Sequence, residues 1–132
     1  MERGVRVTGP LPPARAWERY AVPARWAGWA PQIRGVTASA ERIAAGVTGR
    51  VRGPLGVRVA FVVTDVDEQR RTWAWTVTSG AGRCGPVRMH LRHGVEPDPR
   101  GTATWLTLVG PAPAVVAYQP VARIALWRLV RL

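Results

Sequence analysis

One histidine has the residue type and the sequence position best suited to acid–base chemistry. His93 shares the alternation of Leu91 and Val95, which predicts that its side chain lies on the buried face of a strand. A neutral imidazole there could serve as general acid or base, because its ordinary pKa lies close to neutral pH. His93 is therefore the first candidate catalytic residue, and Tyr20 is the second. The alternative is a core histidine held by one hydrogen bond.

The other reactive side chains give weaker signals. His90 has the opposite parity to His93, so the two cannot converge on one metal ion, and no metal is expected. The segment 80–85 matches G-x-G-x-x-G, but Pro86 and an alternating strand follow it instead of a helix, which favours a hairpin loop over a nucleotide site. Cys84 lacks a neighbouring His or Lys that would activate its thiol. No cofactor is expected.

Apolar and aromatic side chains are the candidates for binding. Aromatic walls suit a flat or long apolar ligand, and tyrosine and indole groups add directional polar contacts. The alternative is that the same side chains form a solid core. The candidate ligand-binding residues are Trp26, Trp29, Ile33, Phe61, Trp73, Trp75, Met89, Leu91 and Tyr118. Asp65 shares the parity of Phe61 and Val63, so it could reach the rim of such a site.

Length and composition indicate one globular domain covering residues 1–132. The hydrophobic fraction of 47% excludes a disordered chain. The net charge is +11, yet all 19 basic residues are Arg, which is typical of a GC-rich coding preference. These arginines are spread along the chain instead of forming a stripe with interleaved aromatics, so no nucleic-acid partner is expected.

The chain start and the cysteine content indicate a location. The first residues contain no apolar stretch typical of a signal peptide, and no uncharged apolar run approaches the roughly 18 residues of a membrane span. A single Cys excludes a disulfide framework within the chain and fits a reducing compartment. We therefore expect a cytoplasmic protein without a membrane span.

Periodicity predicts an α+β fold. A strand at 5–8 precedes two short helices, at 14–21 and 23–29, each bounded by prolines. Six segments of alternating character follow, at 35–40, 47–52, 57–64, 72–78, 87–96 and 102–109, and short links between them predict an antiparallel meander. A helix over 114–132 closes the chain, and Pro120 should kink this helix or mark its start.

Two tryptophans fall on faces predicted to be exposed. Trp105 has the solvent-facing parity of its strand, and Trp127 lies near the arginine side of the last helix. Exposed aromatic rings near arginines suit a homodimer contact or a membrane-surface contact. For Trp105 the alternative is a β-bulge that reverses the register of its strand.

This order of elements, together with several short motifs, resembles the SRPBCC superfamily of START and birch-allergen-like domains, in its polyketide cyclase/dehydrase group. The motifs are Pro13 to Trp17, Trp26-Ala27-Gly28-Trp29-Ala30-Pro31, Gly46, the strand end Val63-Thr64-Asp65-Val66, Trp75, His93-Gly94-Val95-Glu96-Pro97, Gly101-Thr102 and Gly110-Pro111. The resemblance implies a helix-grip fold, in which a curved seven-stranded antiparallel sheet surrounds the long C-terminal helix. It transfers no catalytic residue.

The resemblance also implies a cavity for a hydrophobic small molecule. The favoured expectation is a cofactor-independent enzyme of natural-product biosynthesis, similar to polyketide cyclases and dehydratases, which folds and cyclises a reactive intermediate. The alternative is a non-catalytic protein that binds or transports a lipid or another hydrophobic metabolite.

Overall fold

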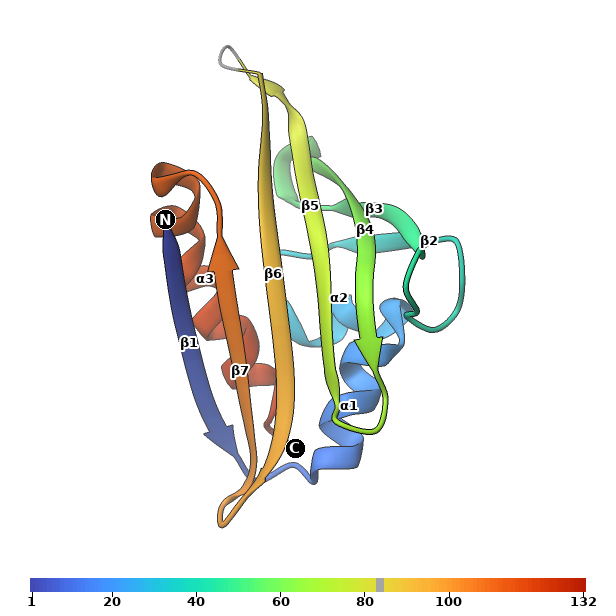
Figure 1. Cartoon of the computed structure of the whole chain (residues 1–132), viewed down its shortest axis with the longest axis vertical. Helices are drawn as coiled ribbons and strands as arrows, with labels where there is room; N and C mark the ends of the chain where they lie inside the picture. Colours follow the sequence, from blue (N-terminus) through green and yellow to red (C-terminus); the bar gives the residue numbers. More distant parts are fainter. Residues whose placement is uncertain (83–84) are drawn as a thin grey trace.

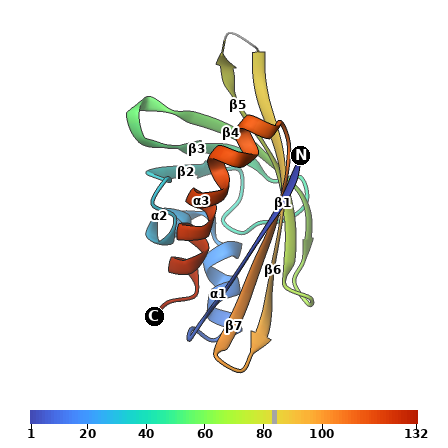
Figure 2. The ribbon, with the colours of Figure 1, turned by 90° about the vertical axis from the view of Figure 1, so that its left-hand side faces the viewer.

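The computed structural model describes residues 1–82 and 85–132, and within them one antiparallel sheet wraps around a helix (Figures 1 and 2). The seven strands of this described part pair in the order β1-β7-β6-β5-β4-β3-β2. Strands β2 to β7 therefore form the predicted meander, and β1 pairs with β7. The strands are β1 Glu2–Gly9, β2 Gly35–Ala38, β3 Thr48–Arg52, β4 Arg58–Asp67, β5 Thr72–Gly82, β6 Gly85–Asp98 and β7 Gly101–Val109.

Short helices follow β1, as predicted. Helix α1 spans Pro13–Ala21, a 3-10 turn spans Pro23–Arg25, and α2 spans Trp26–Trp29. Proline at the first position of α1 costs little, because the N–H it lacks would have no partner in the helix. A second 3-10 turn, Pro54–Gly56, joins β3 to β4. The seven-stranded helix-grip prediction is confirmed.

Helix α3, Ala112–Leu129, lies across the concave face of the sheet (Figure 2). Pro120 lies inside this helix, so the expectation that Pro120 could mark its start is wrong. Val115, Ala122 and Leu126 face the sheet and are buried. Ile124 and Trp127 are about half exposed, and the Arg131 guanidinium lies 4.5 Å from the centre of the Trp127 ring. A homodimer contact or a membrane-surface contact through this surface stays a prediction.

The two faces of the sheet differ in polarity. Val51, Phe61 and Leu91 point to the concave side and are buried, whereas the arginines that alternate with them, such as Arg50 and Arg92, are exposed. This matches an antiparallel sheet with one dry and one solvated face. The core therefore lies between the sheet and the helices.

A β-bulge in β4 overturns one parity prediction. The pairing of β4 with β5 shifts between Val63 and Asp65, so Thr64 is an extra residue in the strand. After the bulge Val66 pairs with Trp73. Asp65 points outward and lies 3.4 Å from Arg92 on the solvated face. Asp65 therefore does not reach the rim of the cavity.

Trp105 has the predicted outward orientation. The ladder between β6 and β7 contains no register shift in the described residues, so the bulge alternative is wrong. Trp105 pairs with Gly94, and the indole ring lies where a side chain at position 94 would stand. A glycine opposite the ring lets Trp105 lie flat on the sheet, half-buried.

Candidate functional site

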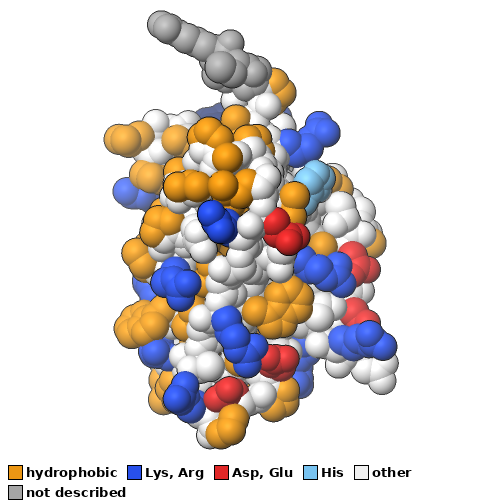
Figure 3. All heavy atoms as spheres, turned by 60° about the vertical axis from the view of Figure 1, so that its left-hand side comes forward, with side chains coloured by type: hydrophobic (Ala, Val, Ile, Leu, Met, Phe, Trp, Pro, Cys, Tyr) orange, Lys and Arg blue, Asp and Glu red, His pale blue; other side chains and the backbone are white. Residues whose placement is uncertain are grey.

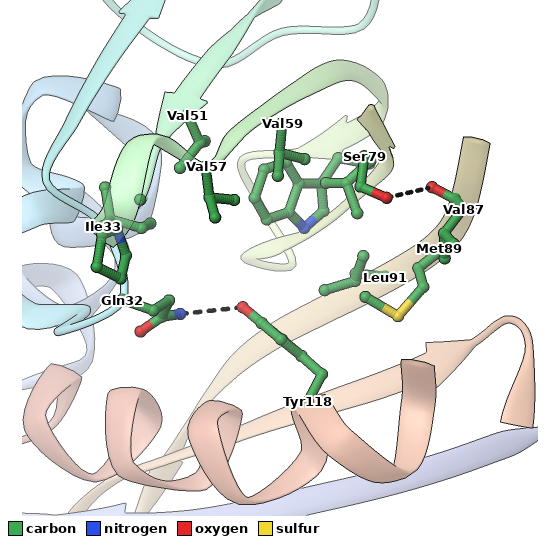
Figure 4. A pocket seen from close by; sticks show the side chains of 14 residues that line it. Gln32, Ile33, Val51, Val57, Val59, Ser79, Val87, Met89, Leu91 and Tyr118 are labelled. Carbon is green, nitrogen blue, oxygen red and sulfur yellow. Dashed lines mark hydrogen bonds between the residues drawn. The ribbon is translucent and has the colours of Figure 1, made fainter. Parts of the chain in front are cut away.

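An apolar pocket of about 350 Å³ lies between the concave face of the sheet and α3 (Figure 4). Strands β3 to β6 supply most of its walls, and Tyr118 extends into it from α3. Its lining residues are Gln32, Ile33, Val51, Gly53, Pro54, Val57, Val59, Trp75, Val77, Ser79, Val87, Met89, Leu91 and Tyr118. None of these is charged, so the pocket favours an uncharged guest.

Three lining side chains are polar, and all three already make hydrogen bonds. The Gln32 amide donates from Nε2 to the Tyr118 hydroxyl over 3.0 Å, and the Ser79 hydroxyl donates to the Val87 carbonyl over 3.4 Å (Figure 4). Burial raises the pKa of Tyr118, so its hydroxyl stays protonated at neutral pH. Because the Tyr118 oxygen accepts the amide proton, its own O–H remains available to a guest.

Behind the pocket wall, His93 belongs to a buried chain of hydrogen bonds. Trp75 donates from Nε1 to His93 Nε2 over 3.0 Å, and His93 Nδ1 lies 3.3 Å from the Tyr20 hydroxyl. The Tyr20 hydroxyl lies 2.7 Å from Thr104 Oγ1, which donates to the Gly94 carbonyl over 3.0 Å. Both ring nitrogens of His93 therefore have partners.

The ends of this chain determine where each proton lies. An indole N–H only donates, so His93 Nε2 must accept and the neutral ring carries its proton on Nδ1. That proton is donated to Tyr20, whose own hydroxyl then donates to Thr104. Burial lowers the pKa of His93 to about 3 and raises that of Tyr20. At neutral pH both groups are uncharged and the proton positions are fixed.

A second, much smaller void of about 20 Å³ lies deeper in the core. Its size corresponds to roughly one water molecule. Trp73 and His93 line it, and their rings stack with centroids 4.7 Å apart. Trp73 Nε1 and Gln32 Oε1 are buried without a hydrogen-bond partner among the described residues. Gln32, Ile33, Trp75 and Tyr118 line both spaces, so they form the partition between them.

The predicted site residues divide into three groups. The large pocket is lined by Ile33, Trp75, Met89, Leu91 and Tyr118. Of these two spaces, the small void alone is lined by Trp26, Trp29, Trp73 and His93, and neither is lined by Phe61 or Tyr20. His93 and Tyr20 thus lie behind the wall of the large pocket.

Sequence reasoning missed much of the pocket lining. Gln32 lies in the segment between α2 and β2, which has no periodicity that could indicate its orientation. The inward parity of Val51, Val59 and Val77 was readable, but valine on a dry face is equally typical of a solid core. The turn residues Gly53 and Pro54 carried no signal of a pocket.

Several other predictions concern groups outside this pocket. His90 is exposed and bonded to Thr76, on the opposite face of β6 from His93. Arg83 and Cys84 lie outside the described residues, so the prediction for the glycine-rich loop stays a prediction. Among the described helices, none combines the length and apolar character needed to cross a bilayer.

The sequence matches a family model almost end to end. The model for polyketide cyclase/dehydrase and lipid transport proteins matches residues 4–131. No curated protein matches the chain.

Solved structures reproduce the fold at low sequence identity. Protein MLL2253 from Mesorhizobium loti has a TM-score of 0.82 at 16% identity, covering 98% of this chain and 93% of its own. The hypothetical protein jhp0584 from Helicobacter pylori gives 0.79 at 13%, covering 98% and 84%. Ara h 8.0201 gives 0.75 at 15%, covering 98% and 95%. The fold and the family model agree, and the chain belongs to the polyketide cyclase/dehydrase and lipid transport family.

Proposed function

We propose that this protein binds an uncharged hydrophobic small molecule in the pocket between the sheet and α3. The observation that carries the proposal is the pocket itself, about 350 Å³ in volume and lined, within the described part of the chain, by no charged side chain. This volume lies at the lower end of the roughly 300–1,000 Å³ typical of ligand sites. A carboxylate or ammonium group would be desolvated there without a counter-charge, at a cost of several kcal/mol or more.

Binding without chemistry is the role that the geometry supports best. The polar groups on the pocket wall are the Gln32 amide and the hydroxyls of Tyr118 and Ser79, none of which is a strong acid or base. The imidazole of His93 uses both nitrogens in hydrogen bonds and faces away from the large pocket. The protein in this proposal holds or carries its guest.

A pocket-filling substitution tests this proposal. The probe is N-phenyl-1-naphthylamine, an uncharged aromatic molecule whose fluorescence rises in apolar surroundings. Val59→Phe adds volume inside the pocket, and we expect it to weaken probe binding at least tenfold. Val62→Phe is the matched control, because Val62 is on the same strand but exposed. Equal affinity of both variants and the parent protein would contradict binding at this site.

A catalytic role in natural-product biosynthesis, as a cyclase or dehydratase-like enzyme, is the second candidate. It is supported by the family, whose description includes polyketide cyclases and dehydrases, and by the buried His93–Tyr20 pair directly behind Trp75. Holding a flexible intermediate in a reactive conformation can alone contribute up to about 7–11 kcal/mol. His93, assisted by Tyr20, would add proton transfer worth roughly 10²–10⁴-fold.

The acid–base part of this second candidate is tested with His93→Gln and Tyr20→Phe. Each purified variant is incubated with a linear poly-β-ketone thioester, and cyclised product is followed by mass spectrometry. If proton transfer matters, turnover falls at least a hundredfold in His93→Gln while probe affinity stays unchanged. If the parent protein gives product and both variants keep its rate, His93 and Tyr20 are structural. If the parent protein returns the thioester unchanged, the binding role alone stands for this substrate class.

A further inference from the structure

The turn between β3 and β4 exposes a strained leucine beside the pocket. Leu55 is fully exposed and has φ of +59°, a left-handed conformation that is unfavourable for a residue with a side chain. Val57, two residues later, is 52% exposed and also lines the pocket. Figure 2 shows this β3–β4 connection projecting away from the rest of the sheet. Among the described residues, no packing contact compensates the exposure of the Leu55 side chain or its backbone strain.

Two arginines lie directly opposite each other at the base of the same turn. Arg52 on β3 and Arg58 on β4 are register partners, and both are exposed on the solvated face. Like charges in directly opposite positions of a ladder repel each other. Arg52 donates to the Thr37 hydroxyl over 3.0 Å, and neither guanidinium has a carboxylate within 4 Å among the described residues. An external anion would relieve this repulsion.

The acidic residues of β4 and β6 lie at the end of the sheet opposite to this turn. Asp65 and Asp67 occupy the far end of β4, and Glu96 and Asp98 the far end of β6. The ends of β3 and β4 that lie at the pocket carry arginine and no acidic residue. The pocket end of the sheet is therefore electropositive, within a chain of net charge +11.

We propose that the β3–β4 turn docks on an anionic lipid bilayer. Leu55 and Val57 enter the boundary between headgroups and acyl chains, while Arg52 and Arg58 lie over lipid phosphates. A projecting apolar tip backed by cations fits this boundary. A protein partner would need a contact area of about 800 Å² on each side, which one turn does not offer. Docking would also bring the pocket to the bilayer, so that an apolar guest need not cross water.

The electrostatic part is tested by flotation of the full chain with vesicles. One set is phosphatidylcholine alone, and the other is an equimolar mixture of phosphatidylcholine and phosphatidylglycerol. We expect binding to the anionic vesicles only. The double variant Arg52→Gln/Arg58→Gln should bind roughly thirty-fold more weakly, since each basic residue at an anionic surface contributes about 1 kcal/mol. Arg15→Gln/Arg123→Gln is the control, because both arginines are exposed and lie on helices α1 and α3.

The apolar part is tested by Leu55→Asn, because asparagine tolerates the left-handed conformation while removing the apolar side chain. This variant should lose at least tenfold in vesicle binding. Ile124→Asn, at an exposed apolar position on α3, should bind like the parent protein. The proposal is overturned if Arg52→Gln/Arg58→Gln and Arg15→Gln/Arg123→Gln lose the same vesicle affinity. It is also overturned if Leu55→Asn and Ile124→Asn do so, because the attraction would then be spread over the whole molecule.

This test is separate from that of the proposed function. Binding of N-phenyl-1-naphthylamine is measured without vesicles and should be unchanged in Arg52→Gln/Arg58→Gln and Leu55→Asn. Vesicle binding without probe binding would refute the pocket role and leave docking intact. Probe binding without vesicle binding, in both vesicle compositions, would refute docking and leave the pocket role intact.

Discussion

A single hydrogen bond, donated by the Trp75 indole N–H, links the pocket wall to the core. The indole ring forms part of the pocket wall, and its N–H donates to His93 on the other side of that wall. Replacing this donor would leave a buried imidazole nitrogen unpaired, at a cost of about 1–3 kcal/mol. The identity of one wall residue is therefore linked to the stability of the core.

The buried His93 predicts how stability depends on pH. Its pKa is about 3 in the folded protein and near 6.5 when exposed, so the unfolded chain takes up a proton first as the pH falls. The contribution of neutral His93 is complete above pH 6.5 and is lost toward pH 3. Between pH 7 and pH 5 the free energy of unfolding should fall by about 2 kcal/mol.

Urea titrations at these two pH values measure this difference, and His93→Gln supplies the comparison. Carboxylates remain mostly ionised over this range, so the variant should lack most of the pH dependence. An equally steep dependence in His93→Gln would assign the effect to other groups and contradict a depressed His93 pKa.

Gly94 should tolerate no side chain. A Cβ at this position would overlap the Trp105 ring. We expect Gly94→Ala to lower the free energy of unfolding by about 1–3 kcal/mol, the cost typical of overpacking. Gly28→Ala is the control, because nothing lies within 4 Å of a Cβ there. Thermal unfolding of the two variants and of Gly94→Ala/Trp105→Ala measures the effect. If removing the ring does not recover stability, the overlap is not the cause.

At the scale of elements, alternation predicted most strand faces but could not locate the exception. Thr64 has no feature that distinguishes a bulge from a regular strand position, yet it moves Asp65 to the solvated face and Val66 to the dry one. The pocket was equally hidden, because an apolar parity is shared by residues that line a space and residues that fill it. Phe61 packs in the solid core against Trp26 and Trp75, whereas Val59 on the same strand lines the pocket.

Helix α3 contains its own weak point at Pro120. Proline lacks the N–H that would bond to the Val116 carbonyl, and its ring crowds the preceding turn. Pro120 is exposed, so Pro120→Ala should raise the free energy of unfolding by about 1–3 kcal/mol. Urea unfolding of the variant and of the parent protein measures this change. Ala117, an exposed residue in the same part of the helix, is the same in both proteins. A loss of stability would show that the local shape of the proline turn is required where Tyr118 enters the pocket.

At the scale of the whole molecule, the dominant feature is the excess of basic over acidic residues. The net charge of +11 opposes compaction through self-repulsion, which salt screens. Figure 3 shows hydrophobic side chains gathered at one end of a face on which arginines are otherwise widely distributed. The arginine count was readable from the sequence, but the fold determines that Arg52 meets Arg58.

Salt should therefore stabilise this protein. Raising the ionic strength toward 1 M shortens the screening length to about 3 Å, which removes long-range repulsion while leaving apolar burial in place. We expect Tm to rise when sodium chloride is added, as measured by circular dichroism. A falling Tm would mean that the exposed ion pairs, such as Arg42 with Glu18 and Glu68, outweigh the repulsion.

The hydrogen bonds that run from Trp75 to the Gly94 carbonyl have a consequence for recognition. The series begins at an indole N–H, which only donates, and ends at a carbonyl, which only accepts, so its hydrogen bonds run in one direction only. The Trp75 indole is thus oriented by the fold itself, and under the proposed binding role little entropy would remain to be lost there when a guest arrives. In the proposed binding role, such a fixed wall would distinguish guests by their shape.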